Sequence, residues 1–111
     1  MTYTIEEIKN TAIPIFEEYG VNRLSIFGSY ARGEANNESD IDFLIDKGEL
    51  RGLIQYFALV NKLEEAFKCH IDLITMGISD KEFLKKVQKE VLVIYEKWRQ
   101  KKLLKRLILL L

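Results

Sequence analysis

The residues FGSYARGE at 27–34, followed at 39–42 by SDID, dominate the interpretation of this 111-residue chain. Within the first segment, Gly28 and Ser29 come directly after an apolar, strand-like stretch. Glycine lets a phosphate group approach the backbone closely, and the serine hydroxyl adds a donor beside the N–H groups of a helix start. Arg32 follows about one helical turn later, where a guanidinium can neutralise phosphate charge. The segment therefore predicts a phosphate-binding turn between a strand and a short helix.

The second segment carries a pair of carboxylates, Asp40 and Asp42. The residues from 41 to 46 alternate between apolar and mostly acidic side chains, which indicates a strand. Side chains two residues apart on a strand project from the same face, about 6.6 Å apart along the backbone. Such a pair suits Mg²⁺, which typically takes one or two carboxylates and completes its shell with water and substrate phosphates. We predict that Asp40 and Asp42 are metal ligands.

A third carboxylate, Asp72, lies within the apolar stretch HIDLI at 70–74. An unpaired charge among apolar neighbours is costly, which favours a functional reason for its presence. Beside the strand that carries Asp40 and Asp42, it completes a metal-binding triad. Two metal ions held about 3.5–4 Å apart would stabilise the attacking and leaving oxygens of an in-line displacement. Asp72 is alternatively the group that orients or deprotonates an acceptor hydroxyl.

The rest of the chain predicts alternating helices and strands. Capping boxes at Thr4 to Glu7 and Ser79 to Glu82 open two of the helices. Apolar spacing and alternation predict the order helix, strand, strand, helix, strand, helix, at residues 5–19, 21–27, 41–46, 50–67, 70–75 and 81–98. This order is typical of an α/β (α+β) domain in which helices cover a small sheet.

The composition fits one soluble globular domain, with 48% hydrophobic and 31% charged residues. Lys plus Arg and Asp plus Glu both total 17, which argues against direct nucleic-acid binding as the main task. The lone cysteine, Cys69, excludes an internal disulfide and is interpreted as a small core residue. Together with the lack of a signal-peptide pattern at the N-terminus, it predicts a cytoplasmic protein.

The C-terminus differs in character from the rest. We interpret residues 1–98 as the domain and residues 99–111 as a basic, Leu-rich helical extension. The apolar run at 103–111 is shorter than the roughly 20 residues that a membrane span needs, so no membrane association is expected. A helix there would carry one apolar stripe that another surface must cover. The stripe consists of Leu103, Leu104, Leu107, Ile108 and Leu111.

In combination, these motifs resemble the DNA polymerase β-type nucleotidyltransferase superfamily, and the short chain resembles its minimal (MNT-domain) branch. The similarity runs roughly from residue 5 to residue 98. It implies a mixed sheet flanked by helices, with ATP or another nucleotide as donor and Mg²⁺ at the aspartates. It also implies that Gly28 and Ser29 hold the triphosphate and that Asp40, Asp42 and Asp72 form the triad.

The sequence leaves the roles of four other side chains undetermined. His70 shares a strand face with Asp72, which is compatible with a catalytic role, but a partly exposed strand residue is the simpler interpretation. Glu34 is either near the nucleotide or a solvated loop charge. Tyr30 and Tyr56 have the chemistry to stack on a base, although such spacing more often reflects packing.

Three functions are compatible with these residues. The first, which the family resemblance implies, is transfer of AMP from ATP to a hydroxyl of a partner HEPN-type toxin, with tyrosine as the leading candidate and this chain as the antitoxin. The second is nucleotidyl transfer to a small molecule. The third is non-catalytic neutralisation of a partner by occlusion. The intact aspartates argue against the third, and the small size, which leaves little chain to enclose a free acceptor, argues against the second.

Overall fold

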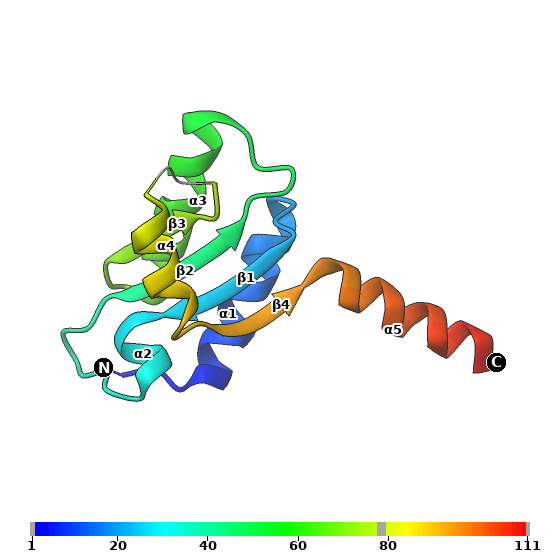
Figure 1. Cartoon of the computed structure of the whole chain (residues 1–111), viewed down its shortest axis with the longest axis horizontal. Coiled ribbons are helices and arrows are strands. Elements are labelled where there is room, and N and C mark those ends of the chain that lie inside the picture. Colours follow the sequence, from blue (N-terminus) through cyan, green and yellow to red (C-terminus); the bar gives the residue numbers. More distant parts are fainter. Residues whose placement is uncertain (1, 78–79, 111) are drawn as a thin grey trace.

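The computed structural model describes residues 2–77 and 80–110, without the side chains of residues 99–103. Its centre is a four-stranded sheet with the order β3-β2-β1-β4. Strand β1 (Arg23–Phe27) pairs antiparallel with β2 (Ile41–Asp46) and β4 (Leu92–Glu96), whereas β2 pairs parallel with β3 (Ile71–Thr75) (Figure 1). The sheet is therefore mixed, and the predicted fold class is confirmed.

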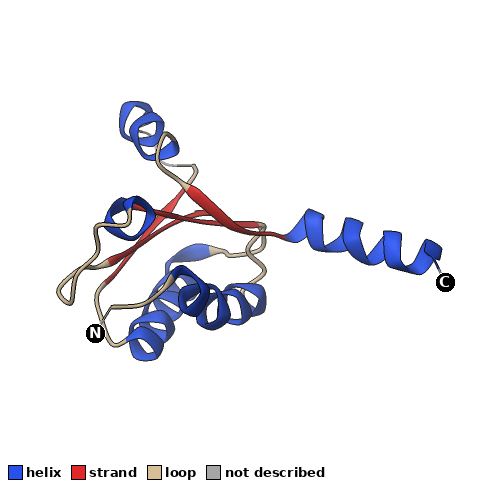
Figure 2. Cartoon of the chain, turned by 90° about the horizontal axis from the view of Figure 1, so that it is seen from below, coloured by secondary structure: helices blue, strands red, loops and turns tan. Residues whose placement is uncertain are grey.

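Helices cover both faces of this sheet (Figure 2). Helices α1 (Ile5–Glu18) and α3 (Gly52–Phe67) share the larger core on one face, and α4 (Lys81–Gln88) covers the other. The short helix α2 (Gly28–Arg32) continues directly from β1. Helix α1 opens with the predicted capping box: the Thr4 hydroxyl accepts from the Glu7 N–H at 3.0 Å, and the Glu7 carboxylate accepts from the Thr4 N–H at 2.9 Å.

The alternation of β2 determines which side chains reach the larger core. Ile41, Phe43 and Ile45 are fully buried there, and the opposite face of the strand carries Asp42 and Leu44. Burial of each such apolar side chain contributes about 1.5–3 kcal/mol, so the core fixes which face the aspartate occupies. Aromatic rings of three elements meet in this core, namely Phe16, Phe43 and Phe67.

The predicted helix over residues 81–98 is wrong in its second half. Helix α4 ends at Gln88, and residues 92–96 form strand β4. Apolar residues from 83 to 98 happen to recur at helical spacing, but the run Leu92 to Tyr95 is also rich in strand-forming side chains. Pairing with the otherwise open edge of β1 decides in favour of the strand. Of the second predicted capping box, Ser79 lies outside the described residues, and Asp80 caps α4 by accepting from the Phe83 N–H at 3.0 Å.

The topology gathers four chain segments at one end of the sheet. Phe27, the last residue of β1, pairs with Asp42, and Asp42 pairs with Asp72 near the start of β3. Strand β4 begins at Leu92, which pairs with Ile26 near the end of β1. The end of β1 and the starts of β2, β3 and β4 therefore lie side by side.

Helix α5 (Lys97–Leu110) projects away from the sheet (Figure 1). The apolar side chains of Leu104, Leu107 and Ile108 are about 60% exposed in this structure. Those of Leu103 and Leu111, the other members of the predicted stripe, lie outside the described residues. Among the described residues, no helix combines the length and apolar character needed to cross a bilayer.

We propose that α5 serves association and not nucleotide binding. Truncation after Gln100 should then change the oligomeric state or the solubility, because exposed aliphatic surface of this kind is normally covered. Analytical ultracentrifugation together with titration of a non-hydrolysable ATP analogue checks both halves of this expectation. Replacing Leu104, Leu107 and Ile108 by Gln in the full-length chain is the matched control. Loss of analogue binding in a folded truncated protein would refute the proposal that α5 takes no part in nucleotide binding.

Candidate functional site

The predicted phosphate-binding turn lies at the junction of β1 and α2. Gly28 adopts a left-handed backbone with φ of 71°, and Gly33 ends the short helix with φ of 75°. A Cβ atom on Gly28 would collide with the Asp42 carboxylate. Because position 28 needs both a left-handed backbone and close approach to a side chain, only glycine satisfies it without strain. Ser29, on the first turn of α2, is half-buried.

Asp42 and Asp72 are brought together by strand register. They are direct partners in the parallel pairing of β2 and β3, and their carboxyl groups lie within hydrogen-bonding reach of one another. Burial raises the pKa of Asp42 to about 7, and the hydrogen bond and charge of Asp72 and the charge of Asp40 act in the same direction. The Arg32 charge opposes the shift only in part. Without a cation, ionising both carboxyl groups at the same time is therefore energetically unfavourable.

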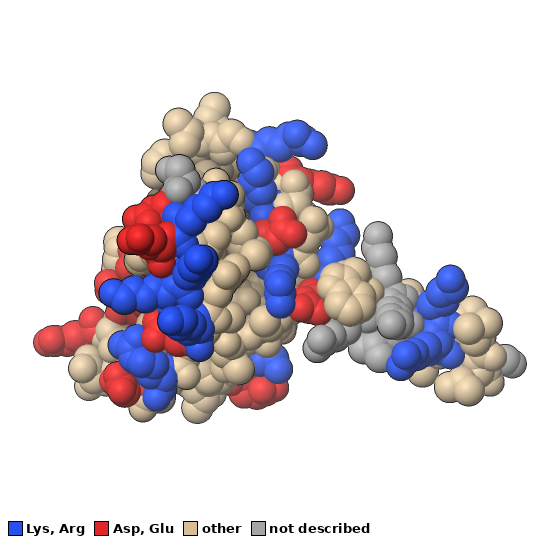
Figure 3. Space-filling model, in the orientation of Figure 1, with Lys and Arg blue, Asp and Glu red and all other residues tan. Residues whose placement is uncertain are grey.

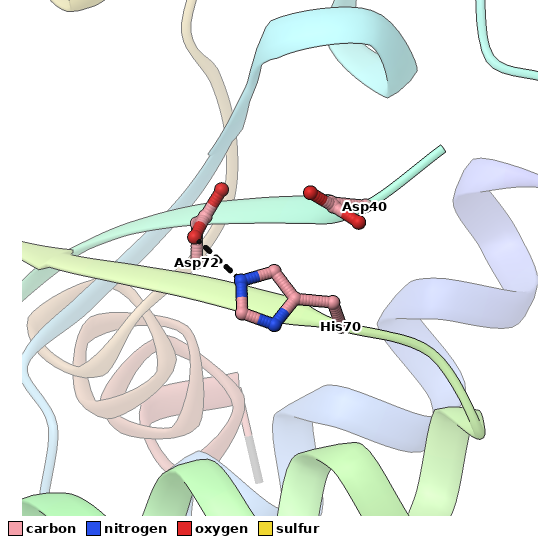
Figure 4. Close-up of side chains that lie close together, drawn as sticks. All are labelled: Asp40, His70 and Asp72. Carbon is pink, nitrogen blue, oxygen red and sulfur yellow. Dashed lines mark hydrogen bonds and ion pairs between the residues drawn. The ribbon is translucent and has the colours of Figure 1, made fainter. Parts of the chain in front are cut away.

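The third predicted ligand, Asp40, faces the same region. Ligand atoms of Asp40, His70 and Asp72 all lie within 4.8 Å of one another, and all three side chains are exposed. Figure 4 shows Asp40 just before β2, with His70 and Asp72 on the neighbouring chain segment, their polar atoms turned toward a shared space. Carboxylate and imidazole atoms at this spacing fit a divalent cation, and in this cluster His70 stands where the sequence predicted Asp42.

His70 is more closely integrated than its sequence position suggests. Its Nε2 lies 3.0 Å from Asp72 Oδ1, and its Nδ1 lies 3.4 Å from Glu64 Oε2. The hydrogen bond to Asp72 raises the pKa of His70, although the side chain is 59% exposed. The predicted partial exposure of His70 is confirmed, but the residue lies just before β3 and not within a strand, and it contacts Asp72. The i, i+2 spacing of HID was the signal for this contact.

Arg32 lies between two glutamates. Its Nε donates to Glu34 Oε2 at 2.9 Å, and its Nη1 donates to Glu90 at 3.2 and 3.3 Å. The hydrogen bond to Glu34 raises the pKa of Arg32 most, and the hydrogen bond to Glu90 acts in the same direction. Glu34, which the sequence left open, is therefore a partner of Arg32 and not an isolated loop charge. Glu90 was not anticipated at all.

An open pocket of about 350 Å³ adjoins the aspartates. Its polar wall contains Asp42, His70 and Asp72, and its remaining lining is apolar. The apolar lining comes from β1, α3, β3 and α4: Phe27, Tyr56, Phe57, Val60, Ile71, Leu73, Ile74 and Phe83. Tyr56 donates its hydroxyl to the Leu73 carbonyl at 2.7 Å, while Tyr30 is buried in the core, as a packing role predicts. A pocket of about 400 Å³ at the other end of the sheet contains none of the predicted site residues.

The raised pKa of Asp42 makes stability depend on pH in the metal-free protein. Between pH of about 4 and 7 the folded chain retains a proton that the unfolded chain releases, so stability falls as pH rises through this range. Asp42→Asn removes this loss and should stabilise the protein at pH 8. Because Asp42 is half-exposed, solvent screening reduces the gain to about 1–2 kcal/mol, well below the full pKa difference.

Thermal unfolding in a chelator between pH 4 and pH 8 tests this expectation. The difference between Asp42→Asn and the wild type should grow with pH and vanish near pH 4. Asp46→Asn, on the exposed end of the same strand, is the matched control. An unfolding midpoint of Asp42→Asn that parallels the wild type at every pH would show that the pKa of Asp42 is not raised in the folded protein.

Comparison with known proteins agrees with this geometry. The family model "Polymerase beta, Nucleotidyltransferase" matches residues 10–100. The protein adenylyltransferase MntA of Thermococcus cleftensis is 33% identical over 95 residues, covering 82% of this chain and 96% of the relative.

Two solved structures share the fold. A toxin–antitoxin with AMP-PNP aligns with a TM-score of 0.72 and 21% identity, covering 86% of this chain and 78% of its own. A tri-AMPylated Shewanella oneidensis HEPN toxin in complex with MNT antitoxin aligns with a TM-score of 0.64 and 18% identity, covering 86% and 75%. With its glycine turn, its converging aspartates and a family match over most of its length, the chain belongs to the polymerase β nucleotidyltransferase family and is an enzyme of that class.

Proposed function

We propose that this chain is a Mg²⁺-dependent protein adenylyltransferase that transfers AMP from ATP to a tyrosine hydroxyl of a HEPN-type toxin and so acts as its antitoxin. The observation that supports transfer most strongly is the pairing of Asp42, which lies against Gly28, with Asp72, whose carboxylate clusters with Asp40 and His70. A protein acceptor is supported by the relative named protein adenylyltransferase and by the fold shared with an antitoxin bound to an AMPylated toxin.

The proposed donor site combines the turn and the aspartates. Gly28 and Ser29 hold the triphosphate through backbone and hydroxyl donors, and Arg32 neutralises its charge. Asp40 and Asp42 would hold Mg²⁺ with Asp72 beside them, and the cation would supply positive charge that stabilises the transferring phosphoryl group. ATP as donor is supported by the ATP analogue present in a structure of the same fold.

The proposed acceptor site is the apolar pocket beside Asp72. A tyrosine side chain matches its chemistry because the ring suits the aromatic wall and the hydroxyl can face the carboxylates. In the reaction, the hydroxyl oxygen forms a bond to the α-phosphorus while the bond from that phosphorus to the β-phosphate oxygen breaks. Pyrophosphate leaves, and Asp72, held in orientation by His70, takes the hydroxyl proton. Docking of a whole protein would position the acceptor without an enclosing domain.

Asp42→Asn should abolish transfer while the protein stays folded. The substitution is nearly isosteric but removes a charge that the cation needs, so the rate should fall by on the order of a hundredfold or more. Mass spectrometry of the co-expressed partner should show added AMP with the wild type and none with Asp42→Asn. Asp46→Asn should retain transfer. A partner that stays unmodified yet is neutralised by Asp42→Asn would establish occlusion, and labelling confined to small molecules would establish the small-molecule alternative.

Asp72→Asn separates two roles of the third aspartate. If Asp72 prepares the acceptor, as proposed, binding of a non-hydrolysable ATP analogue with Mg²⁺ should survive while transfer fails. If Asp72 is a full metal ligand, both should weaken. Calorimetric titration beside a transfer assay distinguishes these results. Unchanged binding with unchanged turnover would show that Asp72 has only a structural role.

A further inference from the structure

Glu90 reaches into the predicted phosphate-binding turn from a distant part of the sequence. It lies in the connection between α4 and β4, and the pairing of Leu92 with Ile26 brings this connection beside the end of β1. Glu90 Oε1 accepts from the backbone N–H of Gly28 at 3.3 Å. The same carboxylate accepts from Arg32 Nη1, at 3.3 Å through Oε1 and at 3.2 Å through Oε2.

These partners are the donors that the proposed function assigns to the triphosphate. A carboxylate and a phosphate oxygen accept the same hydrogen bonds, namely those of a backbone N–H and a guanidinium. The contact opens on a surface hollow of about 290 Å³ that is also lined by Phe83 and Lys86, so an incoming phosphate can reach it. The Glu90 side chain is 34% exposed and Arg32 is 44% exposed, and ion pairs at such exposure are weak enough to be displaced.

Glu90 differs from the other acidic side chain near the turn in the donors that it contacts. Figure 3 shows acidic and basic side chains interleaved over α2 and α4, so the turn is not surrounded by one sign of charge. Glu34 is also paired with Arg32, but it contacts the guanidinium only, whereas Glu90 also accepts from Gly28. Among the described residues, Glu90 is therefore the carboxylate that engages both kinds of phosphate donor.

We propose that Glu90 is an internal substitute for phosphate, which occupies the Gly28 N–H and Arg32 in the free enzyme and is displaced when the triphosphate binds. Glu90 then sets the nucleotide affinity and disfavours ligands that carry a single phosphate, since these gain too few contacts to displace it. This inference rests on the proposed function, because it needs the triphosphate at Gly28 and Arg32. Glu90 is a specificity-determining residue and takes no part in the chemical step.

Binding of a non-hydrolysable ATP analogue and of inorganic phosphate, each titrated in Mg²⁺, tests the proposal with the full-length chain. Glu90→Gln keeps the size and one acceptor oxygen but removes the competing charge. It should tighten analogue binding about fivefold or more, and it should make inorganic phosphate binding measurable. Glu34→Gln is the matched control, since it removes the other charge on Arg32 without releasing Gly28, and it should change the affinity at most about twofold. In a transfer assay, Glu90→Gln should lower KM for ATP more than it changes kcat.

The outcomes separate the inference from the function on which it rests. If wild type binds the analogue and Glu90→Gln binds it equally or more weakly, Glu90 merely supports Arg32, and the substitute role is wrong while the nucleotide site stands. An equal gain in Glu34→Gln and Glu90→Gln would reduce the effect to general charge and would also overturn the proposal. If the wild type and both variants fail to bind the analogue at millimolar concentration, the proposed function fails and this inference fails with it. Thermal unfolding of each variant confirms that it is folded.

Discussion

The site depends on the register between the parallel strands β2 and β3, which sets Asp42 opposite Asp72. Two carboxylates at this distance repel one another unless one is protonated or a cation lies between them. The repulsion between these carboxylates destabilises the end of the sheet, and stabilising contacts elsewhere in the fold offset it. A slip of one residue in either strand would turn its carboxylate to the opposite face and remove the arrangement entirely.

The larger core is what prevents that slip. Ile41, Phe43 and Ile45 alternate with the acidic positions of β2 and are fully buried against α1 and α3. Each contributes about 1.5–3 kcal/mol through burial, so their sum exceeds the cost of one poorly paired carboxylate. Gly28 adds a second constraint from the neighbouring strand, because only a residue without a side chain leaves room for Asp42. The same alternation thus builds the core on one face and the acidic site on the other.

Sequence reasoning succeeded where the determining pattern is local. The alternation of β2 predicted that strand with its observed bounds, and the glycine after an apolar run predicted the turn that begins α2. It failed at β4, where a helical spacing and a strand-forming composition coexist and only the open edge of β1 decides between them. It missed Glu90 because that contact joins residues 62 positions apart, and no spacing along the chain encodes which loop returns to a given strand end. The same reason explains why the sequence did not predict that aromatic side chains of β1, α3 and α4 meet in one pocket.

The charges around the Gly28 turn favour a triphosphate that enters the proposed site together with a divalent cation. Asp42 lies against Gly28 and pairs with Asp72, Glu90 accepts from the Gly28 N–H, and Arg32 is paired with both Glu90 and Glu34. A free polyanion would meet a region with more carboxylates than cationic partners, which opposes its approach.

A triphosphate that arrives with a divalent cation brings the missing positive charge to the aspartates and releases the proton that Asp42 otherwise retains. Cation and phosphate would then bind as mutually dependent ligands: the cation satisfies the acidic cluster, and the phosphates satisfy the donors that Glu90 gives up. A single phosphate offers neither enough charge to hold the cation nor enough contacts to displace Glu90. For the proposed transfer, the acidic excess at the sheet end is therefore a reason for selectivity toward the metal-bound triphosphate and not an obstacle to it.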